Sequence, residues 1–490
     1  MERYNLVVLG AGSGGLVVAA GGASLGARVA LVEKHPIDYP GPSGSVRAMG
    51  GDCLHTGCVP SKALLRAAKA AHEARETSRF GLAGPGDPGP QDLGAVMDWV
   101  RSRQTAIAPH DSIARFRELG VEVFEGEGRL ESAHEVTVNG TTLRGRHVVI
   151  ATGSRPRVPK IPGLAEGGFL TNETVFGLRK LPASLVVIGG GPIGVELGQA
   201  FARLGSKVTI VSKTPHLCLK EDADAAVVLE KKLLEEGLSL FEEAAPVRVE
   251  AGGGVKRVTV RRKDGVETTV AADEILVAAG RRPNVEGLNL DGVGVAHSAT
   301  GIRTDARCRT NVSSVWAIGD VAGAHLFTHW ASHQAGVVLK NTLFPVALAR
   351  CDAGNVPRVT YTDPEIAHVG LTERAARESG IPFTAFRAGF DRNDRSVCEG
   401  DSGELFSKIL VGSQGRILGA TIVHPRAGDL LAEIVLAKKQ DLPVSALGSV
   451  IRAYPTLSEI HGAVAREVLK TALTPGRKNL LASLAAFLRR

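Results

Sequence analysis

The chain has 490 residues, enough for about two to four domains, and its apolar (44%) and charged (22%) fractions are those of a globular protein. Its six cysteines are too few for a disulfide-stabilised scaffold, and we expect a cytoplasmic, reducing setting. The net charge of +7 is spread along the chain without a nucleic-acid-binding motif, and glycine turns interrupt every long apolar stretch, so neither a nucleic acid partner nor a membrane span is expected.

The first predicted elements form a dinucleotide site. Residues 5–10 (NLVVLG) predict a buried strand, and a helix-like stretch and a second strand, RVALVE, follow. The glycines of the G-x-G-x-x-G pattern are Gly10, Gly12 and Gly15. They allow a tight turn, close approach of a pyrophosphate and packing of helix on strand. Glu33 ends the second strand, where a carboxylate can bind ribose hydroxyls.

The next stretch, GGDCLHTGCVPSK at 50–62, holds Cys53 and Cys58. Such a pair is compatible with half a metal site, a structural disulfide or a working redox pair. His55 lies between the cysteines and could lower a thiol pKa if protonated, although a plain helix position is the simpler interpretation. The preceding segment, 35–49, is rich in glycine and proline and predicts a surface loop.

A second glycine motif follows another apolar strand, within 184–198. Its glycines are Gly189, Gly191 and Gly194. The next strand, KVTIVSK, ends in Ser212 and Lys213, where the first unit has an acid. A hydroxyl and a cation suit the 2′-phosphate of NADPH, so NADPH is favoured over NADH, which remains the alternative.

Three further strand ends are expected to complete the two nucleotide sites. They carry Thr152 and Gly153 in HVVIATGSRP, Gly280 in DEILVAAGRRPN, and Asp320 in SVWAIGDVAG. Each of the first two segments follows one nucleotide unit. An acid such as Asp320 at a strand end can bind the polyol hydroxyls of a cofactor.

These motifs, together with TDPEIAHVG and YPTLSE, resemble the pyridine nucleotide–disulfide oxidoreductases of the dihydrolipoamide dehydrogenase, glutathione reductase and mercuric reductase type. The resemblance implies an α/β fold with two Rossmann-like domains and a C-terminal α+β dimerisation domain. The implied domains are an FAD-binding domain at 1–160 and 285–350, an NAD(P)H-binding domain at 161–284, an interface domain at 355–470 and a tail at 471–490. FAD would occupy the first glycine motif and NAD(P)H the second.

The same resemblance assigns roles around the cysteines. Cys53 and Cys58 become the redox-active disulfide, with Cys58 against the flavin and Cys53 as the outer thiol that meets the acceptor. Lys62 corresponds to the lysine beside the reactive flavin nitrogen, and Glu196 to its partner. With this assignment no resident metal ligands are expected.

The acceptor side departs from the disulfide-reducing members, whose segment is His-Pro-Thr-x-x-Glu. Here Tyr454 takes the place of the histidine and Glu459 is retained. A phenol is a poor base at neutral pH, which weakens the lipoamide and glutathione interpretations. His461 would point away from Glu459 on a helix, so we do not expect it to substitute. By resemblance, Tyr454 and Glu459 of one protomer lie over Cys53 of the other.

Tyrosine at this position resembles mercuric reductases, but no cysteine follows Cys398, so the C-terminal cysteine pair of those enzymes is missing. We therefore expect a mercuric reductase-like enzyme that passes electrons from NAD(P)H through FAD and Cys53–Cys58 to a disulfide or metal-ion acceptor. A dihydrolipoyl dehydrogenase-type disulfide reductase is one alternative. A redox sensor without turnover, docked through the tail, is another.

The last predicted element is a helix after Pro475 and Gly476. Its apolar residues, which form one stripe, are Leu480, Leu481, Leu484, Phe487 and Leu488. The basic residues that flank it are Arg477, Lys478, Arg489 and Arg490. We favour packing on the second subunit, with peripheral membrane or protein contact through 477–490 as the alternative.

Overall fold

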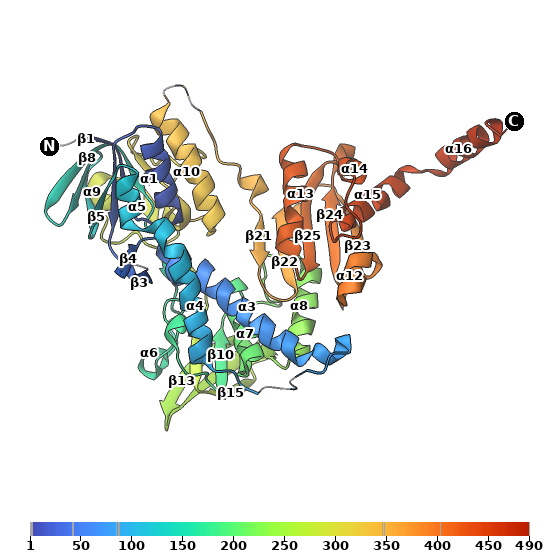
Figure 1. Cartoon of the computed structure of the whole chain (residues 1–490), viewed down its shortest axis with the longest axis horizontal. Helices are drawn as coiled ribbons and strands as arrows, with labels where there is room; N and C mark the ends of the chain where they lie inside the picture. The colour runs from blue at the N-terminus through green and yellow to red at the C-terminus, as the bar shows by residue number, and fades with distance from the viewer. Residues whose placement is uncertain are drawn as a thin grey trace. The chain divides into compact units, whose positions relative to one another are not determined.

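The computed structural model describes residues 3–41, 44–84, 86, 89–344, 346, 348–401 and 403–489 (Figure 1). The chain divides into two compact units. The first comprises Met1–Lys213 and Leu238–Asp352, and the second comprises Thr214–Gly237 and Ala353–Arg490.

A mixed sheet in the first unit carries the first glycine motif. Its strands are β1 (Arg3–Leu9), β2 (Val29–Glu33), β5 (Val121–Glu125), β6 (Gly128–Ser132), β7 (Glu135–Val138), β8 (Thr141–Ile150) and β20 (Val315–Ala317). The order is β5-β2-β1-β8-β7-β6, with β20 paired to β8. The β5, β2, β1, β8 and β20 neighbours are parallel, which aligns the strand ends at one edge of the sheet.

Both faces of this sheet are buried. Leu6 and Val8 of β1 enter the core formed with α1 (Ser13–Ser24) and α10 (Thr328–Leu343), whereas Val7 and Leu9 enter a second core on the opposite face. Successive side chains of a strand point to opposite faces, so a strand buried on both sides must be apolar throughout. The NLVVL run meets this requirement.

A second parallel sheet, β12-β11-β10-β16, carries the second motif. Its elements are β10 (Ser184–Ile188), α7 (Pro192–Leu204), β11 (Lys207–Val211), β12 (Ser239–Phe241) and β16 (Glu274–Val277). An antiparallel sheet is formed by β13 (Ala244–Gly252), β14 (Val255–Arg262) and β15 (Glu267–Ala272). A short pair, β9 (Ser154–Pro156) with β17 (Arg281–Pro283), joins the segments after β8 and β16.

The cysteine motif spans the helices α2 (Gly51–His55) and α3 (Cys58–Arg75), with α4 (Leu93–Ile107) alongside. The prediction of a surface loop at 35–49 is wrong in part, because β3 (Ile37–Gly41) and β4 (Gly44–Ala48) pair as antiparallel strands. The buried Tyr39 ring of β3 stabilises this pair, packing with Leu54 and Ala108. Pro42 and Ser43, which fall in the predicted loop, lie outside the described residues.

The second unit is built on an antiparallel sheet of order β21-β22-β25-β24-β23. Its strands are β21 (Arg358–Thr360), β22 (Glu365–Gly370), β23 (Thr384–Gly389), β24 (Phe406–Val411) and β25 (Ile417–His424). Its helices include α8 (Ala223–Glu235), α11 (Glu373–Glu378), α12 (Asp394–Glu399), α13 (Ala427–Lys439), α14 (Val444–Ser449), α15 (Glu459–Ala472) and α16 (Pro475–Phe487).

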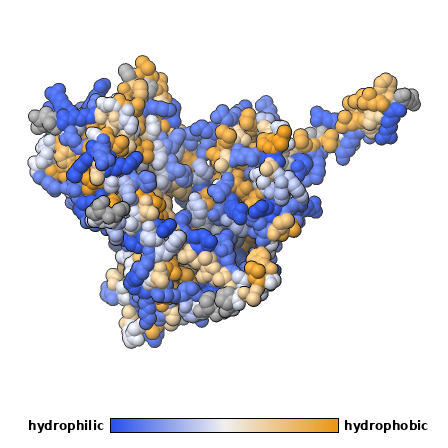
Figure 2. Space-filling view, viewed as in Figure 1, coloured by the Kyte–Doolittle hydropathy of each residue, from blue (hydrophilic) through white to orange (hydrophobic). Residues whose placement is uncertain are grey.

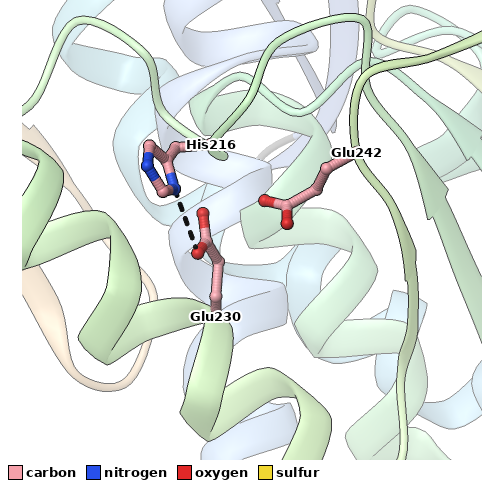
Figure 3. A group of neighbouring side chains, drawn as sticks. All are labelled: His216, Glu230 and Glu242. Atoms are coloured by element: carbon pink, nitrogen blue, oxygen red, sulfur yellow. Dashed lines mark hydrogen bonds and ion pairs between the residues drawn. The ribbon is translucent and has the colours of Figure 1, made fainter. Parts of the chain in front are cut away.

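Charged side chains hold α8 within this unit. Buried Lys408 of β24 forms ion pairs with Asp224 at 2.7 Å and with Glu373 at 2.8 Å. Ahead of α8, His216 Nδ1 lies 3.4 Å from Glu230 Oε2 (Figure 3). A buried charge requires such partners, so the Lys408–Asp224 pair keeps α8 against the sheet.

The predicted tail helix is present as α16, after a break at Leu473 and Thr474. None of its described side chains is buried, and the apolar ones are exposed along it (Figure 2). Arg490 lies outside the described residues. No helix within the described ranges combines the length and apolarity needed to cross a membrane.

Candidate active site

The first glycine motif forms a cradle between β1 and α1. A Cβ on Gly10 would lie 2.5 Å from the Ala151 carbonyl oxygen, and one on Gly15 would lie 1.9 Å from the Gly10 oxygen. A Cβ on Gly12, in contrast, would meet no described atom within 4 Å. The helix α1 starts after Gly12, and no described side chain caps it. Gly12 leaves room for a pyrophosphate to approach the backbone, and the N–H groups at the start of α1 can bind it. The cradle therefore fits the pyrophosphate of FAD.

Two carboxylates lie at the strand ends beside this cradle. Glu33 accepts hydrogen bonds from the Ala11 and His35 backbone N–H groups, at 2.7 and 2.9 Å, which fix its orientation. Asp320, after β20, accepts a hydrogen bond from Ser154 Oγ and lies 3.5 Å from Arg281 Nε. Burial raises the pKa of Asp320. These positions suit the ribose and polyol contacts of FAD.

The segment after β8 is fixed by one asparagine. Thr152 Oγ1 donates to the Asn284 carbonyl oxygen at 2.8 Å, and Asn284 Nδ2 donates back to the Thr152 oxygen at 2.9 Å. The Asn284 N–H also donates to the Gly153 oxygen. The sequence-predicted Thr152 and Gly153 are therefore tied to the segment after β17.

The second glycine motif has the same geometry. A Cβ on Gly189 would lie 2.3 Å from the Ala278 oxygen, and one on Gly194 would lie 2.0 Å from the Gly189 oxygen. Gly191 again faces open space among the described residues and precedes α7. Gly280 has a φ of +105° two residues after Ala278, and its carbonyl accepts the N–H of Arg157. This cradle fits a second dinucleotide.

The predicted 2′-phosphate residues differ in exposure. Ser212 is 3% exposed, and its backbone bonds to Phe241 and Ala244. Lys213 is exposed at the end of β11. Lys213 therefore presents an exposed cation, whereas the Ser212 side chain is buried.

Cys53 of α2 and Cys58 at the start of α3 are in hydrogen-bond contact as thiols. A hydrogen bond from Cys53 lowers the pKa of Cys58 to about 6, and the nearby Lys62 acts in the same direction. The same hydrogen bond, together with burial, raises the pKa of Cys53. The hydrogen bond therefore favours the thiolate at Cys58 and the thiol at Cys53, and thiol–disulfide exchange requires one thiolate of this kind.

The predicted partnership of Lys62 and Glu196 is present in the structure. Lys62 Nζ, on α3, lies 2.7 Å from Glu196 Oε2, on α7. The Glu196 side chain is 7% exposed and that of Lys62 is 38% exposed. A buried carboxylate holds the ammonium in a fixed position near Cys58, where it can stabilise negative charge.

Two side chains around the cysteines, those of Thr328 and Arg281, were not predicted. Thr328 Oγ1, at the start of α10, lies 3.3 Å from Cys58 Sγ. Arg281, in the AAGRRPN segment, bridges Asp52 at 3.2 Å and Asp320 at 3.5 Å. The arginine repeated in ATGSRP and AAGRRPN is Arg282, so the repeat gave no signal for Arg281, and no motif marks Thr328.

His55 does not act on the thiols as a cation. Its ring stacks on Tyr39, and its Nδ1 lies 2.8 Å from the Tyr39 hydroxyl. Burial lowers the pKa of His55 to about 4. At neutral pH the ring is uncharged, which favours the simpler interpretation of His55 as a plain helix position over a cation that lowers a thiol pKa.

The acceptor-side residues belong to the second unit. Tyr454 is 71% exposed, and its hydroxyl donates to Asp394 Oδ2 at 2.7 Å, which raises the pKa of the phenol. Glu459 starts α15 and accepts the Thr456 N–H at 3.3 Å. His461 is fully buried and bonds to the Leu430 carbonyl oxygen at 3.0 Å. His461 is therefore not available to replace the missing imidazole.

Comparison with protein families identifies this arrangement. A model described as pyridine nucleotide-disulphide oxidoreductase matches residues 4–336, and its dimerisation domain matches residues 356–464. The chain belongs to the pyridine nucleotide-disulphide oxidoreductase family. Its fold class and cofactors are those predicted: an α/β flavoprotein that uses FAD and NAD(P)H, with a dimerisation domain that supports a homodimer.

The relatives do not agree on the acceptor. Dihydrolipoyl dehydrogenase of Thermus scotoductus is 35% identical, over 94% of this chain and 96% of that protein. Mercuric reductase of Lysinibacillus sphaericus is 32% identical, over 94% of this chain and 81% of that protein. The Cu(II) complex of the HOCl-induced flavoprotein disulfide reductase RclA from Escherichia coli is 25% identical with a TM-score of 0.81, covering 96% of this chain and all of that one.

Proposed function

We propose that this enzyme transfers electrons from NADPH through the Cys53–Cys58 pair to a thiophilic metal ion, as a mercuric reductase-like oxidoreductase. The supporting observation is the absence of an available imidazole where the disulfide-reducing members have one: Tyr454 stands there with a raised pKa, and His461 is buried. Disulfide reduction needs a group that moves a proton to and from the outer thiol. Ligation of a metal ion needs thiolates instead.

In this proposal, each residue of the site has a separate role in electron transfer. FAD, when bound, supplies the two-electron link between the nicotinamide and the cysteines. Lys62, held by Glu196, stabilises negative charge beside Cys58. Cys58 is ready as a thiolate, and Cys53 gives up its proton when a soft cation binds to its sulfur, because metal ligation favours the thiolate. Tyr454 of the opposite protomer adds an oxygen donor at the acceptor side.

The test is anaerobic NADPH oxidation by the purified homodimer, with Hg(II)–thiol complexes, Cu(II) and lipoamide as acceptors in parallel. Turnover with a metal ion at least tenfold faster than with lipoamide is the expected result. Faster turnover with lipoamide would overturn the metal-ion proposal and establish the dihydrolipoyl dehydrogenase-type alternative. A single reduction without turnover would indicate the redox sensor.

Nucleotide preference is proposed to depend on Lys213. Replacing it by alanine is expected to raise the KM for NADPH by about 10- to 100-fold, with little change for NADH, because a charge-assisted contact to the 2′-phosphate is lost. Steady-state kinetics with both nucleotides measures this. Lys207→Ala, an exposed lysine at the other end of β11, is the matched control. Equal effects on NADPH and NADH would contradict a 2′-phosphate contact.

We also propose that α16 binds an anionic lipid surface, which is the alternative to the packing on the second subunit that the sequence favoured. Its apolar side chains are exposed, Arg477 and Lys478 accompany them, and residues 475–489 contain no acid. The dimerisation-domain match ends before this helix, at residue 464. A basic amphipathic helix combines apolar insertion with attraction to anionic headgroups.

Co-sedimentation with phosphatidylserine-containing vesicles is expected for the full chain. Deleting residues 475–490, or replacing Leu481 and Leu484 by serine, is expected to lower binding to the level of neutral phosphatidylcholine vesicles. Subunit association, measured by analytical ultracentrifugation, is expected to be unchanged. A deletion that dissociates the dimer without affecting vesicle binding would instead assign α16 to the subunit interface.

A further inference from the structure

Two cysteines that are distant in the sequence meet in the first unit, away from the catalytic pair. Cys308 precedes β20 and Cys351 follows α10, yet their sulfur atoms lie 3.3 Å apart. Cys308 is 1% exposed, and Cys351 is partly exposed. Both pack in the core that lies between the sheet and the helices α1 and α10.

Backbone contacts hold the two segments together. The Cys351 N–H donates to the Ala306 carbonyl oxygen at 2.7 Å, two residues before Cys308. On the other side, Ala349 exchanges two hydrogen bonds with the Asn341 side chain of α10, at 2.9 and 3.0 Å. These contacts hold the backbones of the two cysteine segments side by side.

The backbone of Cys308 has an unusual conformation. Its φ is +68°, in the left-handed region that residues other than glycine rarely adopt. The turn is fixed on both sides, since the Cys308 N–H donates to the Asp305 oxygen and the Cys308 oxygen accepts the Ala317 N–H. The backbone is thus held in this conformation at Cys308, whose sulfur lies beside the sulfur of Cys351.

We propose that Cys308 and Cys351 form a second dithiol–disulfide site, oxidised by low-molecular-weight disulfides through thiol–disulfide exchange. A disulfide bond is about 2.05 Å long, so the sulfurs must approach by a little more than about 1 Å. The two thiols also differ in the way that exchange requires. The hydrogen bond from Cys308 lowers the pKa of Cys351, and the same bond raises the pKa of Cys308.

The exchange proceeds in two balanced steps. The Cys351 thiolate attacks one sulfur of the external disulfide, forming a mixed disulfide and releasing one thiolate. Cys308 then attacks the Cys351 sulfur and loses its proton to the released thiolate, while the second external thiolate leaves. The protein pair loses two electrons, and the external disulfide becomes one thiol, which carries the Cys308 proton, and one thiolate.

The site lies close to the strand end that carries Asp320. Gln334 of α10 accepts the Gly319 N–H at 2.7 Å and also contacts the Cys308 thiol. A Cys308–Cys351 bond therefore joins the segment after α10 covalently to the turn that precedes β20. This modification is independent of the electron-transfer proposal, because neither sulfur belongs to the Cys53–Cys58 pair.

The test uses the full chain with Cys53→Ser and Cys58→Ser, which removes the competing pair and leaves four of the six cysteines. The protein is treated with millimolar oxidised glutathione, blocked with iodoacetamide in denaturant and mapped by mass spectrometry. We expect a Cys308–Cys351 cross-linked peptide, loss of two of the four free thiols, and recovery of all four with dithiothreitol.

Two further variants sharpen the result. Adding Cys351→Ser is expected to leave Cys308 as a free thiol, whereas adding Cys398→Ser, at an exposed cysteine, is expected to leave the cross-link unchanged. The same mapping on the unmodified chain guards against a folding defect in the variants. Stable glutathione on Cys351 without a link to Cys308, or two free thiols at these positions, would overturn the proposal.

Discussion

Replacing Cys53 or Cys58 by serine is expected to lower acceptor reduction by roughly three orders of magnitude or more, because each sulfur performs a step that a hydroxyl does not. NADPH-dependent bleaching of the flavin absorbance is expected to persist in both variants. Anaerobic assays with the preferred acceptor, beside single-turnover absorbance measurements, separate the two effects. Cys398→Ser is the control, since Cys398 lies on an exposed face of the second unit.

The two cysteines are also expected to differ in reactivity. In the reduced protein, alkylation of Cys58 by iodoacetamide is expected to rise with pH around a midpoint of about 6, because only the thiolate reacts. Cys53→Ala removes the hydrogen bond that lowers the Cys58 pKa, so the midpoint is expected to move upward. An unchanged midpoint would mean that the Cys53 thiol does not stabilise the Cys58 thiolate.

A serine variant that retained full turnover would place the acceptor elsewhere. Electrons would then reach the acceptor without passing through the Cys53–Cys58 pair, and the assignment of Cys53 as the outer thiol would be wrong. A variant that lost flavin bleaching as well would point to damage at the FAD site, which the flavin content of the purified protein measures. Each outcome therefore distinguishes a chemical role of the sulfurs from a structural one.

The glycine cradles were predictable because a contiguous G-x-G-x-x-G pattern marks each of them. Gly15 and Gly194 lie against the Gly10 and Gly189 oxygens, which the strand–turn–helix path itself brings close. Gly10 and Gly189 lie instead against the oxygens of Ala151 and Ala278, which follow β8 and β16 and are distant in the sequence. The Lys62–Glu196 ion pair joins two helices far apart in the chain, and only the family resemblance made it foreseeable. The helix α16 followed from apolar spacing and the break at Pro475.

Other features depended on packing that no local pattern records. The strands β3 and β4 pair despite the prolines and glycines of this segment, because Tyr39 is buried against neighbouring helices. Thr328 reaches Cys58 only through the position of α10. Cys308 and Cys351 appeared as scattered cysteines, and they meet because the segment after α10 returns to the turn before β20.

Replacing Tyr454 by histidine is expected to raise turnover with lipoamide by about 10- to 100-fold. An imidazole with a pKa near about 6.5 can accept and return the proton of the outer thiol, and Glu459 is present five residues later to orient it. The hydroxyl of Tyr454 does not serve as this base, because its hydrogen bond to Asp394 raises an already high pKa.

The pH dependence of lipoamide turnover by the Tyr454→His variant identifies the cause of any gain in that turnover. Disulfide turnover is expected to increase as the pH passes about 6.5, where the imidazole loses its proton and becomes a base. Tyr454→Phe, of similar size and without a titratable group, is expected to stay at the low starting rate. An equal gain in both variants would show that Tyr454 obstructs the disulfide sterically. In that case the selectivity for a metal ion over a disulfide would depend on the shape of the entrance. It would not depend on the poor basicity of the phenol.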